Sequence, residues 1–136
     1  MEGSSAGRLS RLLGPESFLL FAIAGLFFPW VRTGAGSAAG IEQGDGWPVL
    51  AMAAGAFFLA RAHVRWAWIP AALGAVVTIK DIFTVSGVEG AGAGIGLWMS
   101  AAGLTAATFL LFAREIEAVR RARRAEGSAP PGPLEE

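Results

Sequence analysis

The sequence predicts an all-α fold, that of a polytopic membrane protein with four transmembrane helices. Of its 136 residues, 54% are hydrophobic and 16% are charged, which is too apolar for an ordinary soluble domain of this size. The windows 17–31 and 95–113 carry no charge on any face, whereas the helices of a soluble bundle keep a polar face. The apolar residues gather in four blocks, which define the predicted spans: about 13–31, 46–60, 66–86 and 94–113.

The first block, 13–31, approaches the length of about 20 residues that a helix needs to cross hydrocarbon. A cleaved signal peptide is the alternative, because Arg8 and Arg11 precede the apolar run and small residues near Ala39 offer a cleavage site. The bulky segment 28–32 separates the apolar run from those small residues. We therefore expect this block to be kept as the first span.

The second and fourth blocks each begin at a Gly-x-Gly step that precedes a tryptophan. The glycines are Gly44 and Gly46 in one case and Gly94 and Gly96 in the other. No strand–helix–strand context surrounds either step, so neither is a nucleotide fingerprint. We interpret both as flexible turns into a helix. Each half of the domain then has the same plan, a helix, a Gly-rich connection and a returning helix that ends in Ala-Arg, which suggests two parallel helical hairpins.

The basic residues predict the orientation of the spans in the membrane. Of eleven Lys and Arg residues, nine fall on one side, and Arg32 and Lys80 fall on the other. The positive-inside rule places the side with nine in the cytoplasm. We therefore predict a multi-pass protein of the cytoplasmic membrane with both termini inside. It consists of a cytoplasmic segment 1–12, a transmembrane domain 13–113, and a cytoplasmic basic helix with a disordered tail at 114–136.

The tryptophans support these boundaries, because the indole ring prefers the headgroup level of a bilayer. All five lie at or near a predicted span end. We interpret them as interfacial anchors: Trp30, Trp47, Trp66, Trp68 and Trp98.

Three short motifs bear a family resemblance. They are Pro29-Trp30 at the end of the first span, GDGW at 44–47 and GIGLW at 94–98. In these features the chain resembles small, uncharacterised four-span membrane proteins of actinobacteria, over about residues 15–113. The resemblance implies the four-span architecture and no particular activity. Claudin-type proteins are excluded, because their Gly-Leu-Trp motif accompanies a cysteine pair and this chain has no cysteine. Small multidrug-efflux proteins match poorly, because they resemble a pattern with a membrane-embedded Glu in the first helix, whereas Glu16 lies at the mouth of the first span.

The candidate functional site is an intramembrane polar pair, Lys80 and Asp81. Helical phase places Asp81 on a small-residue stripe that faces the bundle and Lys80 about 100° away on a bulkier face. Ser100 has a similar depth in the fourth span, so a hydrogen bond to Asp81 is expected, with Arg32 or Lys80 as an ionic partner. Such a pair marks an ion, proton or substrate path, or it is an interfacial pair in which Lys80 extends toward the headgroups; we favour the second interpretation.

Several functions are excluded or disfavoured by composition. The formal net charge is zero, so no basic field predicts nucleic-acid binding. Cysteine is absent, and the single histidine has no nearby acid, so we expect no metal site, no cofactor and no catalytic residues. Three acids of the outer connections, Glu42, Asp45 and Glu89, lack the regular spacing of a calcium loop. The protein is therefore not expected to be an enzyme.

The segment that follows the fourth span is basic. We expect it to continue the helix into the cytoplasm, where a cluster of arginines either contacts anionic lipid or serves only to orient the span. The cluster consists of Arg120, Arg121, Arg123 and Arg124.

Together these patterns predict an integral inner-membrane protein of structural or accessory type, which binds a membrane-protein partner or forms a homo-oligomer. The alternative is a small transporter or channel-like protein that uses Asp81 and Lys80. The two differ in the expected effect of Asp81→Asn. It abolishes flux in a transporter, and in an accessory subunit it alters only stability or partner recovery.

Overall fold

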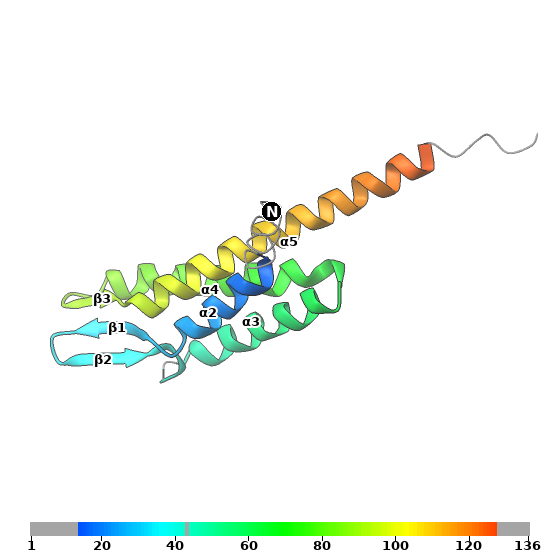
Figure 1. Cartoon of the computed structure of the whole chain (residues 1–136). Helices are drawn as coiled ribbons and strands as arrows, with labels where there is room; N and C mark the ends of the chain where they lie inside the picture. Colours follow the sequence, from blue (N-terminus) through cyan, green and yellow to red (C-terminus); the bar gives the residue numbers. More distant parts are fainter. Residues whose placement is uncertain (1–13, 43, 128–136) are drawn as a thin grey trace, which may run out of the picture.

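The computed structural model describes residues 14–42 and 44–127, and it is mostly helical. Four α-helices form a bundle, and three short strands lie at one end of it (Figure 1). The predicted segment 1–12 and the tail beyond residue 127 lie outside the described residues. In chain order the elements are α2 Pro15–Gly25, β1 Pro29–Thr33, β2 Gly36–Ala39, η1 Gly40–Glu42, α3 Gly46–Arg61, η2 Arg65–Ala67, α4 Trp68–Ser86, β3 Ala91–Ala93 and α5 Ile95–Gly127.

The helices pack in the ring order α2, α3, α4, α5, with α5 closing the ring against α2. Successive helices run in opposite directions (Figure 1). We call the end with the strands the sheet end, and the end with the turn 61–65 between α3 and α4 the turn end. The core is built of small and medium side chains, among them Leu19, Ala53, Ala71 and Leu104, which lets the helices approach closely.

The all-α prediction is wrong in one respect, because the connections at the sheet end form a three-stranded antiparallel sheet. Its strand order is β2-β1-β3, with Arg32 paired to Ser37 on one side and to Gly92 on the other. Val31 and Thr33 are β-branched residues that favour a strand. Sequence patterning missed β2 and β3 because Gly and Ala, which form most of both, are depleted in strands.

The first helix is shorter than predicted. Instead of continuing to Val31, α2 ends at Gly25 after 11 residues. Pro29 disfavours helical backbone at the residue before it, and it has no amide hydrogen to continue the helical ladder. The chain then enters β1, and the indole of Trp30 folds back to donate a hydrogen bond from Nε1 to the Gly25 carbonyl at 3.2 Å.

The other three helices match the predicted blocks more closely. Helix α3 covers the second block, and η2 with α4 covers the third. Helix α5 begins one residue after the predicted start and continues without a break through the basic segment, for 33 residues in total. Its second half extends past the turn end of the bundle (Figure 1).

Two stretches of helix are long and apolar enough to cross a membrane. They are Arg65–Ser86 and the apolar half of Ile95–Gly127. Helices α2 and α3 are also apolar but are shorter, with 11 and 16 residues. By length and composition, therefore, two of the described helices could cross a membrane.

Candidate functional site

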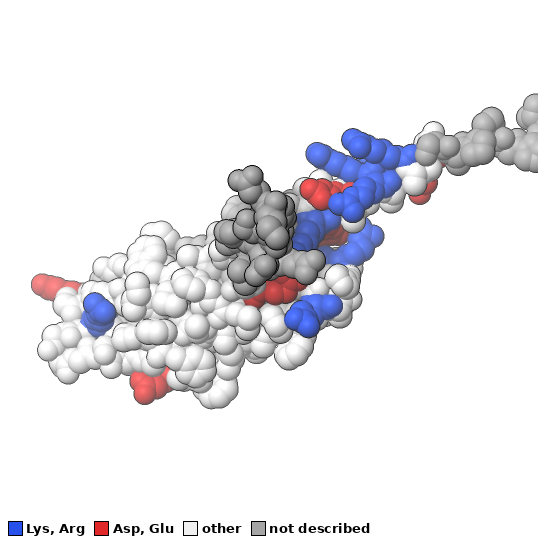
Figure 2. Space-filling view, viewed as in Figure 1, with Lys and Arg blue, Asp and Glu red and all other residues white. Residues whose placement is uncertain are grey.

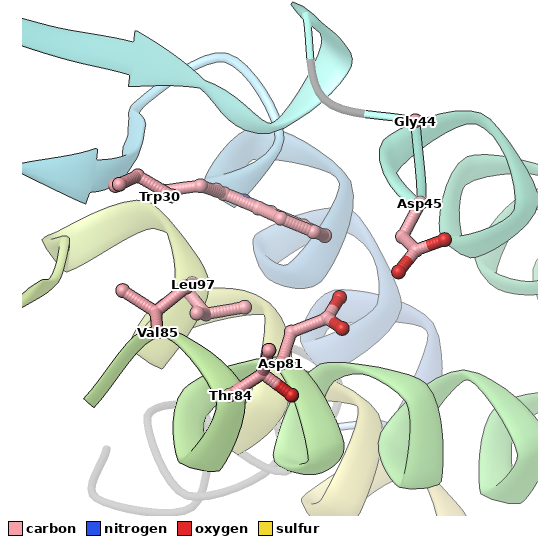
Figure 3. Close-up of a pocket in the computed structure, with 8 residues that line it drawn as sticks. Trp30, Gly44, Asp45, Asp81, Thr84, Val85 and Leu97 are labelled. Carbon is pink, nitrogen blue, oxygen red and sulfur yellow. The ribbon is translucent and has the colours of Figure 1, made fainter. Parts of the chain in front are cut away.

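A cavity of about 250 Å³ lies at the sheet end, where β1, α4 and α5 meet the segment that leads into α3. Its polar lining includes the carboxylates of Asp45 and Asp81 (Figure 3). The apolar side of the cavity is formed by Trp30, Val85 and Leu97, with Val31 and Thr84 completing the wall. Charged groups and an aromatic ring thus share one small space.

Asp81 reaches this cavity from the buried face of α4. The residues at intervals of three and four along that face, Ala71, Gly74 and Thr78, are all buried. Asp81 continues the stripe and is only 8% exposed. The stripe ends at Val85, which is half-buried and also lines the cavity.

Lys80 does not line the cavity and lies on the exposed side of α4. Its ammonium group contacts the two carboxylates that line the cavity. The Nζ atom lies 3.4 Å from Asp81 Oδ1 and 3.3 Å from Asp45 Oδ2. The Lys80 side chain is 63% exposed. One ammonium therefore links two carboxylates that belong to different helices.

Asp45 was predicted only as an acid of an outer connection, and its position is informative. It occupies the N-cap of α3, where an aspartate usually accepts a hydrogen bond from a backbone amide of the first turn. Here the side chain makes no such bond and points at the cavity instead (Figure 3). The sequence signal that identifies it is the Asp of the GDGW motif, a cap residue at a helix start.

Of the three partners expected for Asp81, Lys80 is confirmed, and Ser100 and Arg32 are wrong. The Ser100 hydroxyl donates a hydrogen bond to the Ala22 carbonyl at 2.9 Å, which joins α5 to α2 and leaves the serine without a bond to Asp81. Arg32 lies on β1 and is exposed, with its backbone in the middle of the sheet. The prediction that Ser100 faces the bundle is confirmed, since the residue is buried. The sequence of α5 alone could not show which neighbouring helix the serine faces.

Trp30 is not an interfacial anchor. It is 2% exposed and is among the largest fully buried side chains. Gly40 packs directly on its ring, so closely that a Cβ at that position would collide with the indole. The tryptophan thus joins β1 and η1 to the end of α2, and it forms a wall of the cavity.

The other four tryptophans lie near the two ends of the bundle. Trp47 and Trp98 are exposed at the sheet end, and Trp66 is exposed at the turn end. Trp68 is half-buried and makes an edge-to-face contact with Phe112, with ring centroids 5.4 Å apart. These positions are compatible with the headgroup level.

Three of the four glycines in the Gly-x-Gly steps are close-packing sites, contrary to the predicted flexible turns, and only Gly44 has open space around it. A Cβ on Gly46 would overlap the Gly40 carbonyl, and one on Gly94 would overlap that of Pro29. Gly96 is in the same position against Gly25 of α2. Backbone meets backbone at each of these points, so the sheet end is held by contacts that allow no side chain.

At the turn end, ion pairs join the surfaces of neighbouring elements. Arg114 lies 3.2 Å from Glu16, and Arg65 lies 3.5 Å from Glu115. These pairs connect α5 with the start of α2 and with η2. The arginine side chains of both pairs are more than half exposed to solvent.

The predicted arginine cluster lies on the exposed extension of α5, where blue side chains gather in Figure 2. Arg121 pairs with Glu117 at 3.2 Å. At 1.5 Å per residue, Arg120 and Arg124 are about 10 and 16 Å further along the helix than Ala113. The anionic-lipid contact of these arginines stays a prediction.

The described residues contain no group of three or more His, Cys, Asp or Glu side chains placed to hold a metal ion. The arrangement at the sheet end can form ion pairs and bind a charged group. Comparisons with protein-family models, with curated proteins and with solved structures give no match to this chain. The chemistry of the site therefore rests on its own geometry.

Proposed function

We propose that this chain is a four-span integral membrane protein that acts as an accessory, partner-binding subunit without catalytic chemistry. In this proposal the turn end faces the cytoplasm and the sheet end faces outward, in the cytoplasmic membrane of a bacterium. The resemblance to small four-span actinobacterial proteins accords with it.

The observation that carries the proposal is an apolar belt on the outside of the bundle. Large apolar side chains are exposed on every helix, including Phe21 on α2, Phe58 on α3, Phe83 on α4 and Phe109 on α5. Between the charges of the two ends, the face in Figure 2 shows a wide band without Lys, Arg, Asp or Glu. A soluble protein rarely exposes an apolar patch of this extent, whereas a bilayer covers it.

The sheet supports an outer boundary for this belt. A sheet edge has unpaired backbone groups, which hydrocarbon does not tolerate, so β2 and β3 belong above it. Asp45 and Lys80 lie at the same level, at the start of α3. The ion pair then sits near the interface, where the cost of a charge is lower than at the bilayer centre.

Helix α2 is too short to cross the bilayer alone, and the extended chain after it completes the pass. Strand residues advance about 3.3 Å each, against 1.5 Å in a helix. Phe27 and Phe28 in this stretch are exposed and apolar, as lipid contact requires. The full burial of Leu19 in the bundle core favours keeping this segment over removing it as a signal peptide.

An accessory role is better supported than transport by a single chain. Below Asp81 the described core is apolar, with Leu19, Leu104 and Leu111 filling the centre. The Thr78 hydroxyl in that region donates to carbonyls of its own helix. An ion that crossed from the cavity to the turn end would need polar groups to replace its hydration shell, and these side chains supply none.

The test compares flux with partner recovery for the same variants. Protein purified from native membrane in mild detergent is analysed for stoichiometric co-purifying proteins, and reconstituted liposomes are assayed for proton and cation flux. We expect a defined partner and no flux above empty liposomes. Asp81→Asn should alter only stability or recovery, and Ser37→Ala, on the exposed hairpin, serves as its control. Flux that Asp81→Asn abolishes would contradict the accessory role and favour transport.

A further inference from the structure

We propose that the sheet-end cavity is a binding site for a primary ammonium or guanidinium group that arrives from outside the membrane. Asp45 and Asp81 bind the cation, and Trp30 with its apolar neighbours encloses the group that bears it. The cation site itself follows from the cavity. Only the source of the cationic group rests on the partner-binding role proposed above.

The first argument is the shape and composition of the cavity. It measures about 250 Å³, and its apolar wall of Trp30, Val85 and Leu97 faces two carboxylates (Figure 3). A space of this kind admits a short alkyl chain with a charged head. Carboxylates form their strongest hydrogen bonds with charged N–H donors, and aromatic rings attract organic cations at short range.

The second argument is that a primary ammonium already lies at the two carboxylates. Lys80 Nζ lies within 3.4 Å of an oxygen of each, although its side chain is 63% exposed and is held by nothing else that the structure shows. Lys80 therefore acts as a tethered stand-in for the ligand. An exposed lysine can turn toward lipid phosphates, which leaves the carboxylates available to another cation.

The third argument comes from the helix cap that Asp45 does not make. An N-cap aspartate that accepts hydrogen bonds from the first-turn amides stabilises the start of its helix. Asp45 forgoes this bond and directs its carboxylate into the cavity. It is also the accessible member of the pair, with half of its side chain exposed, whereas Asp81 is nearly enclosed. A ligand entering from outside therefore meets Asp45 first and Asp81 at the end of its path.

The test is chemical rescue of a variant that lacks the stand-in ammonium. Lys80→Ala leaves Asp81 without its cation, and we expect a lower unfolding midpoint in lipid nanodiscs. Butylammonium chloride, which carries the length and charge of the lost side chain, should raise that midpoint by about 3 °C more than sodium chloride at equal ionic strength. The double variant Lys80→Ala, Asp81→Asn should show no such difference.

Three results would overturn the proposal. Equal stabilisation by sodium chloride would mean screening only. Equal stabilisation by tetramethylammonium, which has no N–H donor, would mean that no hydrogen-bonded ammonium site exists. Stronger stabilisation by calcium chloride would indicate a metal site instead.

A second measurement avoids dependence on the fold of the Lys80 variant. Saturation-transfer NMR on the unaltered full-length protein should show contact between the protein and the butyl protons of the amine. Asp45→Asn should reduce that signal at least fivefold, because it removes the accessible carboxylate. An absent signal in the unaltered protein, or an unchanged one in Asp45→Asn, would contradict the site.

The source of the cationic group is decided by a competing peptide. Displacement of butylammonium by acetyl-Gly-Lys-Gly-amide at tenfold lower concentration would assign the site to a side chain of a partner protein. Displacement only at similar concentrations would assign it to free amines. Both results support the cation site, and a failed flux or partner experiment would leave them unchanged.

Discussion

The two ends of the bundle are built on different principles. At the sheet end the backbone of Gly46 meets that of Gly40, Gly94 meets Pro29, and Trp30 is buried between strands and helices. At the turn end, α5 is connected to its neighbours by exposed ion pairs such as Arg114 with Glu16. Close contacts between backbone segments distinguish the first end, which also holds the cluster of Lys80, Asp45 and Asp81. At the second end the connections of α5 to α2 and η2 include ion pairs whose arginines are exposed.

This difference indicates where the molecule tolerates change. Close packing loses stability when any atom is added, whereas exposed ion pairs contribute little and are weakened by salt. The rigid end holds the cavity and its carboxylates in a fixed geometry. The following predictions test this contrast, from the largest expected effect to the smallest.

Trp30→Ala should be the most damaging single change at the sheet end. It removes a large buried side chain and its hydrogen bond to Gly25, so we expect a loss of about 3 kcal/mol or more in the free energy of unfolding. Trp98→Ala, on an exposed residue of the same end, is the control and should lose less than about 1 kcal/mol. Denaturant unfolding in micelles measures both, and equal losses would show that Trp30 is not a core residue.

Gly46→Ala should also destabilise the protein, by about 2 kcal/mol, because its Cβ would overlap the Gly40 carbonyl. Gly44→Ala is a matched control within the same Gly-x-Gly step, since a Cβ there meets nothing within 4 Å. Its effect should stay within about 0.5 kcal/mol. If the two variants unfold alike, the step is a flexible turn and not a packing contact.

At the turn end, breaking an ion pair should have a smaller effect. For Glu16 and Arg114 we expect a coupling energy of about 0.5 kcal/mol, measured by a double-mutant cycle of Glu16→Gln and Arg114→Gln. The coupling should fall as salt is raised from 0.05 to 0.5 M, because the arginine is exposed. A salt-independent coupling above about 2 kcal/mol would remove the contrast between the two ends.

The arginine cluster should have the smallest effect on the bundle. Replacing all four residues with alanine should change the unfolding midpoint by about 1 °C or less in zwitterionic nanodiscs, since the extension lies beyond the packed helices. A larger loss confined to anionic nanodiscs would support the predicted lipid contact. The variant set is Arg120→Ala, Arg121→Ala, Arg123→Ala and Arg124→Ala.

Much of the architecture could be predicted from the sequence, because apolar blocks and helical phase are local properties. Within residues 14–42 and 44–127, the predicted four helices, the boundaries of α3 to within one residue and the continuation of α5 through the basic segment are confirmed. The burial of Asp81 beside an exposed Lys80 is confirmed as well. The sequence also predicts four membrane spans. Two of the described helices, Arg65–Ser86 and Ile95–Gly127, are long and apolar enough to cross a membrane.

Contacts between distant segments could not be predicted in the same way. The sheet depends on pairing of β1 with Ala91–Ala93, some 60 residues away, and Gly and Ala give no strand signal. The role of Asp45 depends on α3 beginning beside Lys80, and that of Ser100 on which neighbour α5 faces. The position of Trp30 at the end of an apolar block predicted an interfacial anchor. Its burial depends on the early end of α2 at Gly25, which lets the indole on β1 return to the Gly25 carbonyl.

The most direct test of the central claim, a membrane protein whose two ends face opposite sides, uses the absence of cysteine in the chain. Two exposed positions are each replaced by a single cysteine, Ser37 in the hairpin and Ala122 on the α5 extension. In intact cells a membrane-impermeant maleimide should label Ser37→Cys and spare Ala122→Cys, which should react only after permeabilisation. Equal labelling of the two positions before permeabilisation, or recovery of the protein in the soluble fraction, would contradict the account.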